Sequence, residues 1–241
     1  MQKRIAEVLL HLNQEFYDAF AEAFSDSRTE SEPGMDRVLA QVGSGESVLD
    51  LGCGQGRLAN LLPPACRYVG IDYSTEMLKI AKARAEDSDC SRVRFLAADL
   101  VNDPWSERLD DTFDWVFLRA VLHHIPGHHY RQDLVRRAAV VVKPGGHLVL
   151  ANWQFLKIER LRRRILPWRV IGLDASDVED NDYLLDWRRQ GRGFRYVHLV
   201  NDAETRTLAS AAGLTINQTF LADGHTNDLT LYAVLVKPDT A

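Results

Sequence analysis

A glycine-rich turn at residues 50–56 has the composition of a ligand-binding loop. It follows an apolar run that is typical of a buried strand, and the residues after it open a helix. Glycine lets the backbone turn sharply and approach a bound molecule closely, and a helix N-terminus presents unpaired N–H groups. Ordinary strand-to-helix loops also contain glycine, so the neighbouring side chains must identify the ligand. The turn reads Asp50-Leu51-Gly52-Cys53-Gly54-Gln55-Gly56.

Three acidic residues lie where a nucleoside-containing ligand would need them. Asp72 comes 20 residues after Gly52, at the end of the second expected strand. A carboxylate at that place can accept hydrogen bonds from both ribose hydroxyls. Asp99 ends the third expected strand and could accept a bond from the exocyclic amine of adenine. Asp50, just ahead of the first glycine, suits a ligand with a positive amino group.

The spacing of the glycines separates two classes of cofactor. A dinucleotide fingerprint would place its third glycine at position 57, where this chain has Arg57. The observed spacing is G-x-G-x-G. S-adenosylmethionine (SAM) carries an ammonium, a carboxylate and a sulfonium but no pyrophosphate, so it matches the acidic residues better than a nicotinamide dinucleotide does. We expect SAM as the cofactor.

Strands and helices must alternate to position these residues. Apolar runs alternate with helical patterns from residue 45 to residue 152, which predicts a parallel sheet with helices on both faces. Ser74 can cap the helix at 74–85, and Asn201 with Glu204 resembles a capping box opening a helix to residue 212. Lys143-Pro144-Gly145-Gly146 predicts a turn. Further helices are expected at 5–20, 35–42, 58–62 and 130–142, and strands at 47–51, 68–71, 93–97, 113–118, 147–152, 214–221 and 229–236, the last two forming a hairpin.

Five segments in this order resemble the successive motifs of class I SAM-dependent methyltransferases. They are VLDLGCGQGRLA, GIDYS, AADL, FDWVFLRAVLHHIP and VVKPGGHLVLANW, and the match covers about residues 45–152. The resemblance implies an α/β, Rossmann-like fold with a seven-stranded, mostly parallel sheet and an antiparallel C-terminal hairpin. It also implies glycines around the amino-acid part of SAM, Asp72 on the ribose and Asp99 near the adenine. The cofactor set we predict is Tyr17, Arg28, Asp50, Gly52, Gly54, Gly56, Asp72, Tyr73, Met77, Asp99, Leu100, Arg119, Ala120 and Val121.

The flanks of this core are similar to one tRNA methyltransferase family, which includes the eukaryotic enzymes that methylate a carboxymethyl group on wobble uridine. The similar segments are FYDAFAEAFSDSR, NWQF, DYLLDW and RYVH. The resemblance implies that Tyr17 and the segment from Ser25 to Arg28 help to close the cofactor site. Where that family usually has Pro-Trp-Pro, this chain has Glu32-Pro33-Gly34. The acceptor that this resemblance implies is a modified uridine in tRNA.

The acceptor decides which residues must act in catalysis. A carboxylate is already ionised at pH 7 and needs a cationic clamp, for which Arg119, Arg28 and Arg195 are candidates. A hydroxyl or carbon acceptor needs a general base, and no residue is an obvious one, although His123 or His124 could serve. The alternative is that these histidines have a structural role and pack against the following helix. We predict Arg119, Arg28 and His124 as the catalytic set.

An arginine-rich segment follows the expected fifth strand. Arg160, Arg163 and Arg164 could contact phosphates, or they could form a solvated helix face with salt bridges. Arg195, Tyr196 and His198 flank a strand-like run, where substrate contact and simple surface exposure are equally plausible. The predicted substrate-binding set is Arg160, Arg163, Arg164, Arg195, Tyr196 and His198.

Composition sets the remaining bounds. The 241 residues carry a net charge of −5, which argues against nucleic-acid binding by bulk charge but leaves room for a local patch. Three cysteines without a disulfide or zinc spacing, and no long apolar run, predict a cytoplasmic protein without metal or membrane segment.

Two alternative functions remain open: a methyltransferase for a small metabolite and a SAM-binding protein without catalysis. We expect one domain, divided into a helical cap (1–43), a SAM-binding core (45–152), an acceptor-side insertion (153–198) and a C-terminal helix and hairpin (199–241).

Overall fold

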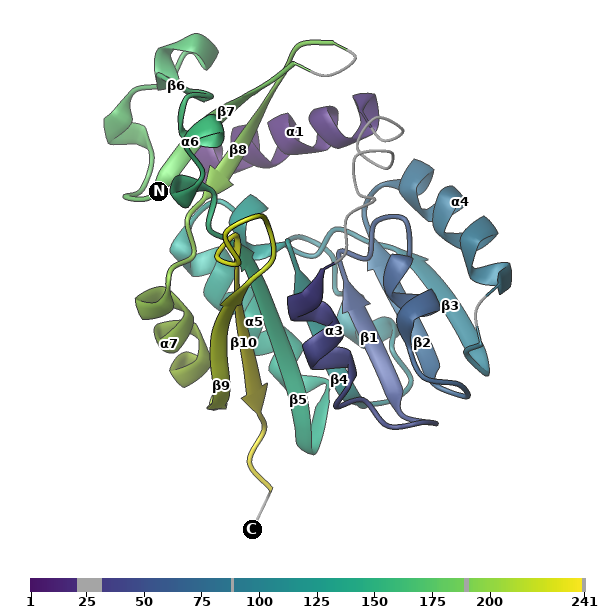
Figure 1. Cartoon of the computed structure of the whole chain (residues 1–241). Coiled ribbons are helices and arrows are strands. Elements are labelled where there is room, and N and C mark those ends of the chain that lie inside the picture. Colours follow the sequence, from purple (N-terminus) through teal and green to yellow (C-terminus); the bar gives the residue numbers. More distant parts are fainter. Residues whose placement is uncertain (21–31, 88, 189–190, 240–241) are drawn as a thin grey trace.

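A seven-stranded sheet forms the centre of the molecule in a computed structural model that describes residues 1–20, 32–87, 89–188 and 191–239. The strand order is β3-β2-β1-β4-β5-β10-β9, and β10 runs antiparallel to both of its neighbours. The predicted fold class is therefore confirmed (Figure 1). The strands are β1 (Ser47–Leu51), β2 (Arg67–Asp72), β3 (Arg92–Ala97), β4 (Phe113–Arg119), β5 (Val142–Trp153), β9 (Thr215–Ala222) and β10 (Thr230–Val236).

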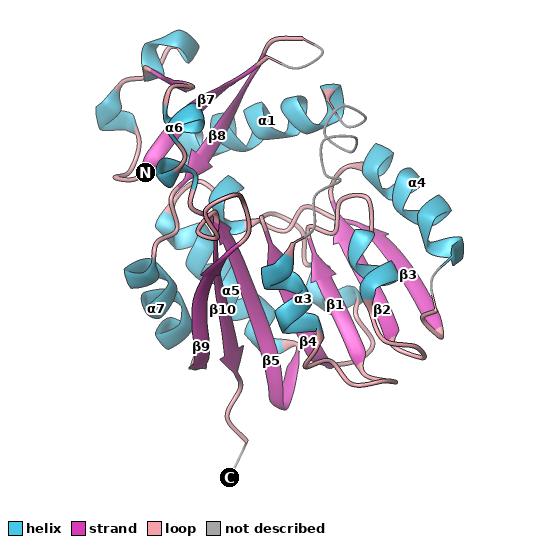
Figure 2. Ribbon diagram, in the orientation of Figure 1, coloured by secondary structure: helices cyan, strands magenta, loops and turns pink. Residues whose placement is uncertain are grey.

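Helices cover both faces of this sheet, as Figure 2 shows. Successive side chains of a strand point to opposite faces, so Leu49 packs with α5 and α7 while Val48 packs with α3 and η1. Every residue of β1 is buried, as expected for a central strand of a parallel sheet. The helices are α1 (Lys3–Ala19), α3 (Pro33–Leu39), α4 (Thr75–Arg84), α5 (His128–Val140), α6 (Glu159–Arg162) and α7 (Asp202–Ala211), with 3-10 turns η1 (Arg57–Leu61), η2 (Ala85–Asp87), η3 (Trp105–Arg108), η4 (Leu122–His124), η5 (Phe155–Lys157), η6 (Trp168–Ile171) and η7 (Ala175–Asp177).

The two predicted helix caps are present. The N–H of Met77 donates to Ser74 Oγ at 3.3 Å, and the N–H of Glu204 donates to Asn201 Oδ1 at 2.9 Å. The Glu204 side chain does not return to Asn201, however, but binds His198 and Arg131. The expected capping box is therefore only half formed, because tertiary partners take the glutamate.

One expectation about local structure was wrong, because the helix expected at 58–62 is a 3-10 turn. The turn expected at Lys143–Gly146 falls within the bounds of β5, which begins at Val142. The pairing with β4 passes from Phe113–Val142 to Trp115–His147, so residues 143–146 leave the ladder with β4, and Gly145 has φ +70°.

The insertion at 153–198 contains a second sheet that the sequence did not predict. Its strands are β6 (Ile165–Leu166), β7 (Asp182–Trp187) and β8 (Gly193–His198), all antiparallel. This sheet and α1 lie above the carboxyl ends of the central strands (Figure 1), and α1 packs directly on β8. Ile5 and Leu9 of α1 bury their side chains against Tyr196 of β8. The N-terminal helix and the insertion therefore form one cover over that edge of the sheet.

Among the described residues, no helix combines the length and apolarity needed to cross a membrane.

Candidate functional site

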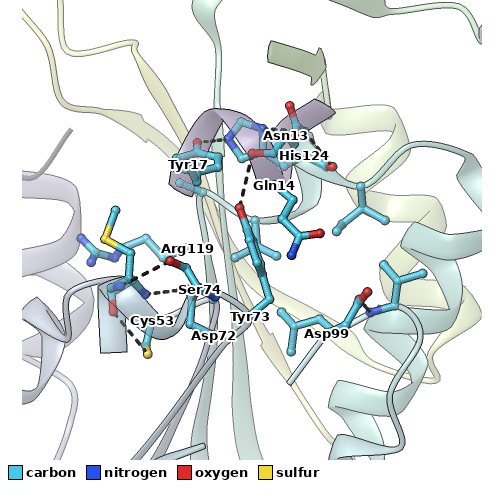
Figure 3. Close-up of a pocket in the computed structure, with 18 of the residues that line it drawn as sticks. Asn13, Gln14, Tyr17, Cys53, Asp72, Tyr73, Ser74, Asp99, Arg119 and His124 are labelled. Atoms are coloured by element: carbon cyan, nitrogen blue, oxygen red, sulfur yellow. Dashed lines mark hydrogen bonds between the residues drawn. The ribbon is translucent and has the colours of Figure 1, made fainter. Parts of the chain in front are cut away.

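A pocket opens between α1 and the carboxyl ends of β1, β2 and β4 (Figure 3). This is the edge of an open α/β sheet at which ligands usually bind. The pocket brings together four groups of residues that are far apart in the chain: α1, the glycine loop, the ends of β2 and β3, and the turn after β4. Its lining consists of Leu10, Asn13, Gln14, Tyr17, Gly52, Cys53, Gly54, Gln55, Arg57, Asp72, Tyr73, Ser74, Met77, Asp99, Leu100, Val101, Arg119, Ala120, Val121, His124 and Ile125.

Two glycines of the loop are required by the geometry. Gly52 has φ +74°, and a Cβ on it would lie 2.4 Å from Val121 Cγ2. Gly54 has φ +53° and faces open space, so a side chain there would enter the pocket. Gly56 does not line the pocket; a Cβ on it would meet Ala81 Cβ at 2.9 Å. Gly54 thus gives a ligand access to the backbone, and Gly52 and Gly56 allow close packing of the loop.

Asp72 holds the glycine loop in place. Its Oδ2 accepts from the N–H of Gly54 at 2.8 Å, and its Oδ1 accepts from the N–H of Ser74 at 2.9 Å. Burial raises the pKa of Asp72, and these backbone bonds oppose that rise. Each carboxylate oxygen has a second lone pair. Asp72 can therefore accept from two ribose hydroxyls while it supports the loop.

Asp99 is held by the turn that follows β3. Its Oδ1 accepts from the N–H of Val101 at 2.7 Å, and its Oδ2 accepts from Asn102 Nδ2 at 2.8 Å. Leu100 and Val101 add apolar surface beside it in the pocket wall. A fixed acceptor next to apolar side chains suits a flat ring with an exocyclic amine, such as adenine.

Asp50 lies behind the glycine loop and does not line the pocket. Its Oδ2 accepts from the Tyr68 hydroxyl at 2.9 Å, while its Oδ1 accepts no hydrogen bond from any described residue. Burial raises the pKa of Asp50 to about 6, although Arg119 and Tyr68 lower it. Asp50 therefore places negative charge behind the loop, which favours a ligand ammonium group seated on it.

Arg119, at the end of β4, forms an ion pair near Asp50 and the glycine loop. Its Nη1 donates to Glu32 Oε2 at 2.8 Å. Burial alone would lower the pKa of Arg119, but the charges of Glu32 and Asp50 outweigh burial and raise it. The sequence analysis did not identify Glu32 as a site residue. The next residue, Ala120, has φ +57°, a left-handed backbone conformation that is strained for any residue other than glycine.

Tyr17 and His124 meet on the opposite side of the pocket, below α1. The Tyr17 hydroxyl and His124 Nε2 are 2.6 Å apart, and His124 Nδ1 faces the carbonyl oxygen of Tyr196 at 3.2 Å. A carbonyl only accepts, so we assign the proton of the neutral ring to Nδ1 and let Nε2 accept from Tyr17. Both nitrogens of His124 are therefore engaged. His123 beside it is buried, as the packing alternative expected.

Asn13 was missed by the sequence analysis. Its Nδ2 donates to the carbonyl oxygens of Tyr196 and His124 at 3.2 Å each, and its Oδ1 accepts from the N–H of Tyr196 at 2.8 Å. This buried amide clamps α1 onto β8 and η4. The polar residues Asn13, Gln14 and Tyr17 share one face of α1 at spacings of three and four, which is the signal that could have revealed them.

The predicted substrate residues fall into three groups. Arg195 is only 8% exposed, and its guanidinium lies 5.0 Å from the ring centre of Trp153, 5.4 Å from Phe16 and 5.6 Å from Trp187. Among the described residues, no carboxylate lies within 4.0 Å of it. Neither Arg195 nor its neighbours on β8, Tyr196 and His198, line the pocket.

Tyr196 and His198 instead belong to a buried polar network. The Tyr196 hydroxyl donates to Asp182 Oδ1 at 2.6 Å. His198 lies between Asp182 Oδ1 at 2.6 Å and Glu204 Oε2 at 2.7 Å. Arg131 joins Glu204 to Glu179, which connects β8 to α5 and α7.

The remaining arginines lie elsewhere. Arg160, Arg163 and Arg164 line a second hollow together with Arg188 and Glu159. Arg28, predicted for cofactor binding and catalysis, lies outside the described residues.

The pocket fits SAM. An open cradle at Gly54, two usable lone pairs on Asp72 and the negative charge of Asp50 behind the loop match the amino-acid part and the ribose. Tyr73 and Met77 line the same wall as Asp72. Among the predicted cofactor residues, Asp50 and Gly56 support the loop from behind rather than lining the pocket.

Comparisons with known proteins agree with this geometry. Residues 48–146 match a family described as a methyltransferase domain. A tRNA (carboxymethyluridine(34)-5-O)-methyltransferase of Arabidopsis thaliana is 34% identical over 137 residues, which cover 57% of this chain and 31% of that protein. A protein of Encephalitozoon cuniculi, named as a methyltransferase without a stated acceptor, is 29% identical over 92% of this chain and 93% of its own length. The chain thus spans about a third of the Arabidopsis relative and nearly all of the second.

A solved structure is similar over most of the fold. The SAM-dependent methyltransferase from Methanosarcina mazei superposes with a TM-score of 0.65 at 19% identity, over 85% of this chain and 98% of that one.

Proposed function

We propose that this chain, a class I SAM-dependent methyltransferase by its matched domain and its fold, methylates a carboxylate on a modified wobble uridine of tRNA. SAM, when bound, supplies a methyl group that its sulfonium already activates for displacement. The protein must then hold the acceptor in line with the methyl group, at about 3–3.5 Å, and exclude water.

The residues around the pocket divide between these tasks. Asp72 and the glycine loop hold the ribose and the amino-acid part of the cofactor, and Asp99 holds the adenine end. Arg119 is committed to Glu32 and to the charge of Asp50, so it acts at the cofactor end. α1, clamped by Asn13, covers the pocket and limits the access of water. The acceptor must enter on the side of His124 and the insertion.

Arg195 is the observation that carries the acceptor assignment. Its buried guanidinium is surrounded by aromatic rings and has no carboxylate within 4.0 Å among the described residues. A row of rings connects it to the pocket: Trp153 lies 6.1 Å from His123, and His123 lies 4.3 Å from His124. An arginine forms strong bidentate bonds with a carboxylate, and aromatic faces stack on a base. This is the chemistry that a carboxymethyl uridine requires.

The state of His124 supports a carboxylate acceptor as well. Both of its ring nitrogens are engaged, with Tyr17 and with the Tyr196 carbonyl. The two carboxylates in the described pocket wall, Asp72 and Asp99, serve the cofactor end. A carboxylate acceptor needs no proton removed, so it fits a wall that presents a clamp rather than a base. The name of the Arabidopsis relative agrees with this acceptor class.

Transfer of tritium-labelled methyl groups tests the proposal. The protein is incubated with labelled SAM and either bulk tRNA or a small-metabolite extract, and each product is then treated with mild alkali. We expect label in tRNA that alkali releases as methanol, because a methyl ester hydrolyses and a methylated base does not. Label in metabolites with none in tRNA would favour the small-molecule alternative. Alkali-stable label in tRNA would refute the carboxylate acceptor.

Variants of Arg195 test its role. We expect Arg195→Gln to lower kcat/KM for tRNA by about 10- to 100-fold, the effect of one lost charge-assisted clamp. The Kd for SAM should stay within about twofold, because Arg195 does not line the pocket. Arg195→Lys keeps the charge and should recover part of the activity. Equal losses in tRNA turnover and SAM affinity would show a structural role instead.

A further inference from the structure

We propose that the hollow lined by Arg160, Arg163, Arg164 and Arg188 binds backbone phosphates of the acceptor RNA. This phosphate site shares no lining residue with the methyl-transfer pocket. The inference rests on the proposed function, since it assigns the acceptor a polynucleotide backbone. It adds Arg188, whose place beside the other three only the fold reveals.

The phosphate site is built by two segments of the insertion. Arg160, Arg163 and Arg164 come from α6 and the residues just after it, and Arg188 follows the end of β7. The N–H of Asp186 donates to the carbonyl oxygen of Arg164 at 2.9 Å, which ties the two segments together. Leu161 of α6 is buried in the insertion's core, so this short helix has a fixed orientation. The four arginines are therefore held on a packed scaffold and form a concave site.

The phosphate site carries more positive than negative side chains. Glu159 is its one carboxylate among the described lining residues, and it pairs with Arg163. Asp186 pairs with Arg188 and also lies 3.8 Å from Arg192. Arg160 has no carboxylate within 4.0 Å among the described residues. Four guanidinium groups against two carboxylates, Glu159 and Asp186, still leave an excess of positive charge, although the whole chain carries −5.

Guanidinium groups that converge on one hollow suit the oxygens of a phosphate group. The planar fork of arginine binds phosphate oxygens through two parallel bonds. A solvated arginine helix would spread its side chains into water, but here two segments converge on one space. A small acceptor in the methyl-transfer pocket would not reach a site with entirely different lining residues. A polymer with regularly spaced phosphates can occupy both.

The position of the phosphate site suits an extended acceptor. In Figure 1, α6 and β7 lie above the carboxyl ends of the central strands, on the side of the sheet edge where the methyl-transfer pocket opens. The same small sheet carries Arg195 on β8, the residue that we assign to the acceptor carboxylate. A single RNA can therefore place its modified base at Arg195 and its backbone against α6.

A matched pair of triple variants tests the phosphate site. Arg160→Gln, Arg164→Gln and Arg188→Gln are combined in one protein. Arg162→Gln, Arg169→Gln and Arg206→Gln are combined in the control, which loses the same charge from exposed arginines that do not line the hollow. Binding of bulk tRNA is measured by filter retention over a range of KCl concentrations, and SAM binding is measured by calorimetry.

We expect the site variant to bind tRNA at least about 10-fold more weakly at 0.1 M salt. The slope of log affinity against log salt should flatten by about 2 to 3, because each lost phosphate contact removes roughly 0.7–0.9 from it. The control should stay within about twofold of the unaltered protein, and all three should bind SAM equally. Equal tRNA affinity and equal salt slope in both triple variants would overturn the inference.

The two proposals fail in different ways. Normal tRNA binding by the site variant, with tRNA still methylated at its carboxylate, would overturn the phosphate site and leave the proposed function standing. Weakened tRNA binding by the site variant, with label found only in metabolites, would support the phosphate site and refute the proposed acceptor.

Discussion

Replacing Asp72 by asparagine separates the two tasks that the structure gives this carboxylate. Asp72 accepts one backbone N–H on each oxygen, from Gly54 and from Ser74, and keeps one lone pair on each for a ribose hydroxyl. Asparagine has a single carbonyl oxygen. Its amide group would face one of the two backbone N–H groups, donor against donor, and it could accept from only one ribose hydroxyl.

The expected magnitudes follow from these contacts. Loss of one of the two ribose bonds to a charged carboxylate should cost roughly 1.5–3 kcal/mol, which weakens SAM about 10- to 100-fold. One buried N–H without a partner should lower the free energy of unfolding by about 1–2 kcal/mol. Removal of a buried charge, whose burial raises the pKa of Asp72, offsets part of that loss. The variant should therefore stay folded at 25 °C while it binds SAM poorly.

Calorimetric titration with SAM and thermal denaturation measure the two effects. Asp114→Asn is a matched control, because Asp114 accepts from the Ser47 N–H at 2.8 Å and from Lys143 Nζ at 2.7 Å but does not line the pocket. All of these bonds end on Asp114 Oδ2, so asparagine can keep them through its amide oxygen and loses only the charge that pairs with Lys143; the Kd for SAM should not change. An unchanged Kd in Asp72→Asn, or an equal rise in both variants, would refute the assignment of Asp72 to the ribose.

Three further predictions concern buried polar groups. Burial alone would lower the pKa of His198, but its bonds to Asp182 and Glu204 outweigh burial and raise the pKa, so the free energy of unfolding should fall as pH rises above 6.5. In urea denaturation from pH 6 to 9, His198→Gln should flatten that fall. An unchanged dependence on pH in the variant would contradict this. Burial raises the pKa of Asp50 to about 6, so its ionisation above that pH destabilises the folded state. Asp50→Asn should therefore raise the free energy of unfolding by up to about 3 kcal/mol at pH 8 but not at pH 4. Equal gains at both pH values would contradict this. Asn13→Ala should speed hydrogen exchange across α1 without unfolding the core, and an unaltered exchange pattern would exclude the clamp.

The sequence alone determined the central sheet and the cofactor end of the pocket. The reason is local: a buried strand, a glycine turn and a helix start are encoded by neighbouring residues, and parallel strands bring their carboxyl ends to one edge. Gly52, Gly54, Asp72 and Asp99 could therefore be placed from spacing and motif resemblance, and the structure puts all four in the pocket wall.

Only the tertiary structure decided the acceptor side. The Arg119–Glu32 pair joins residues 87 positions apart, and the Asn13–Tyr196 bonds join residues 183 apart. The insertion carries no regular strand–helix alternation, because its small antiparallel sheet is stabilised by packing against α1 and by the buried His198 network. Whether an arginine is a clamp, a phosphate ligand or a solvated side chain depends on which carboxylates and rings surround it. Those neighbours come from distant segments, so sequence spacing could propose Arg195 but could not place it among its three aromatic rings.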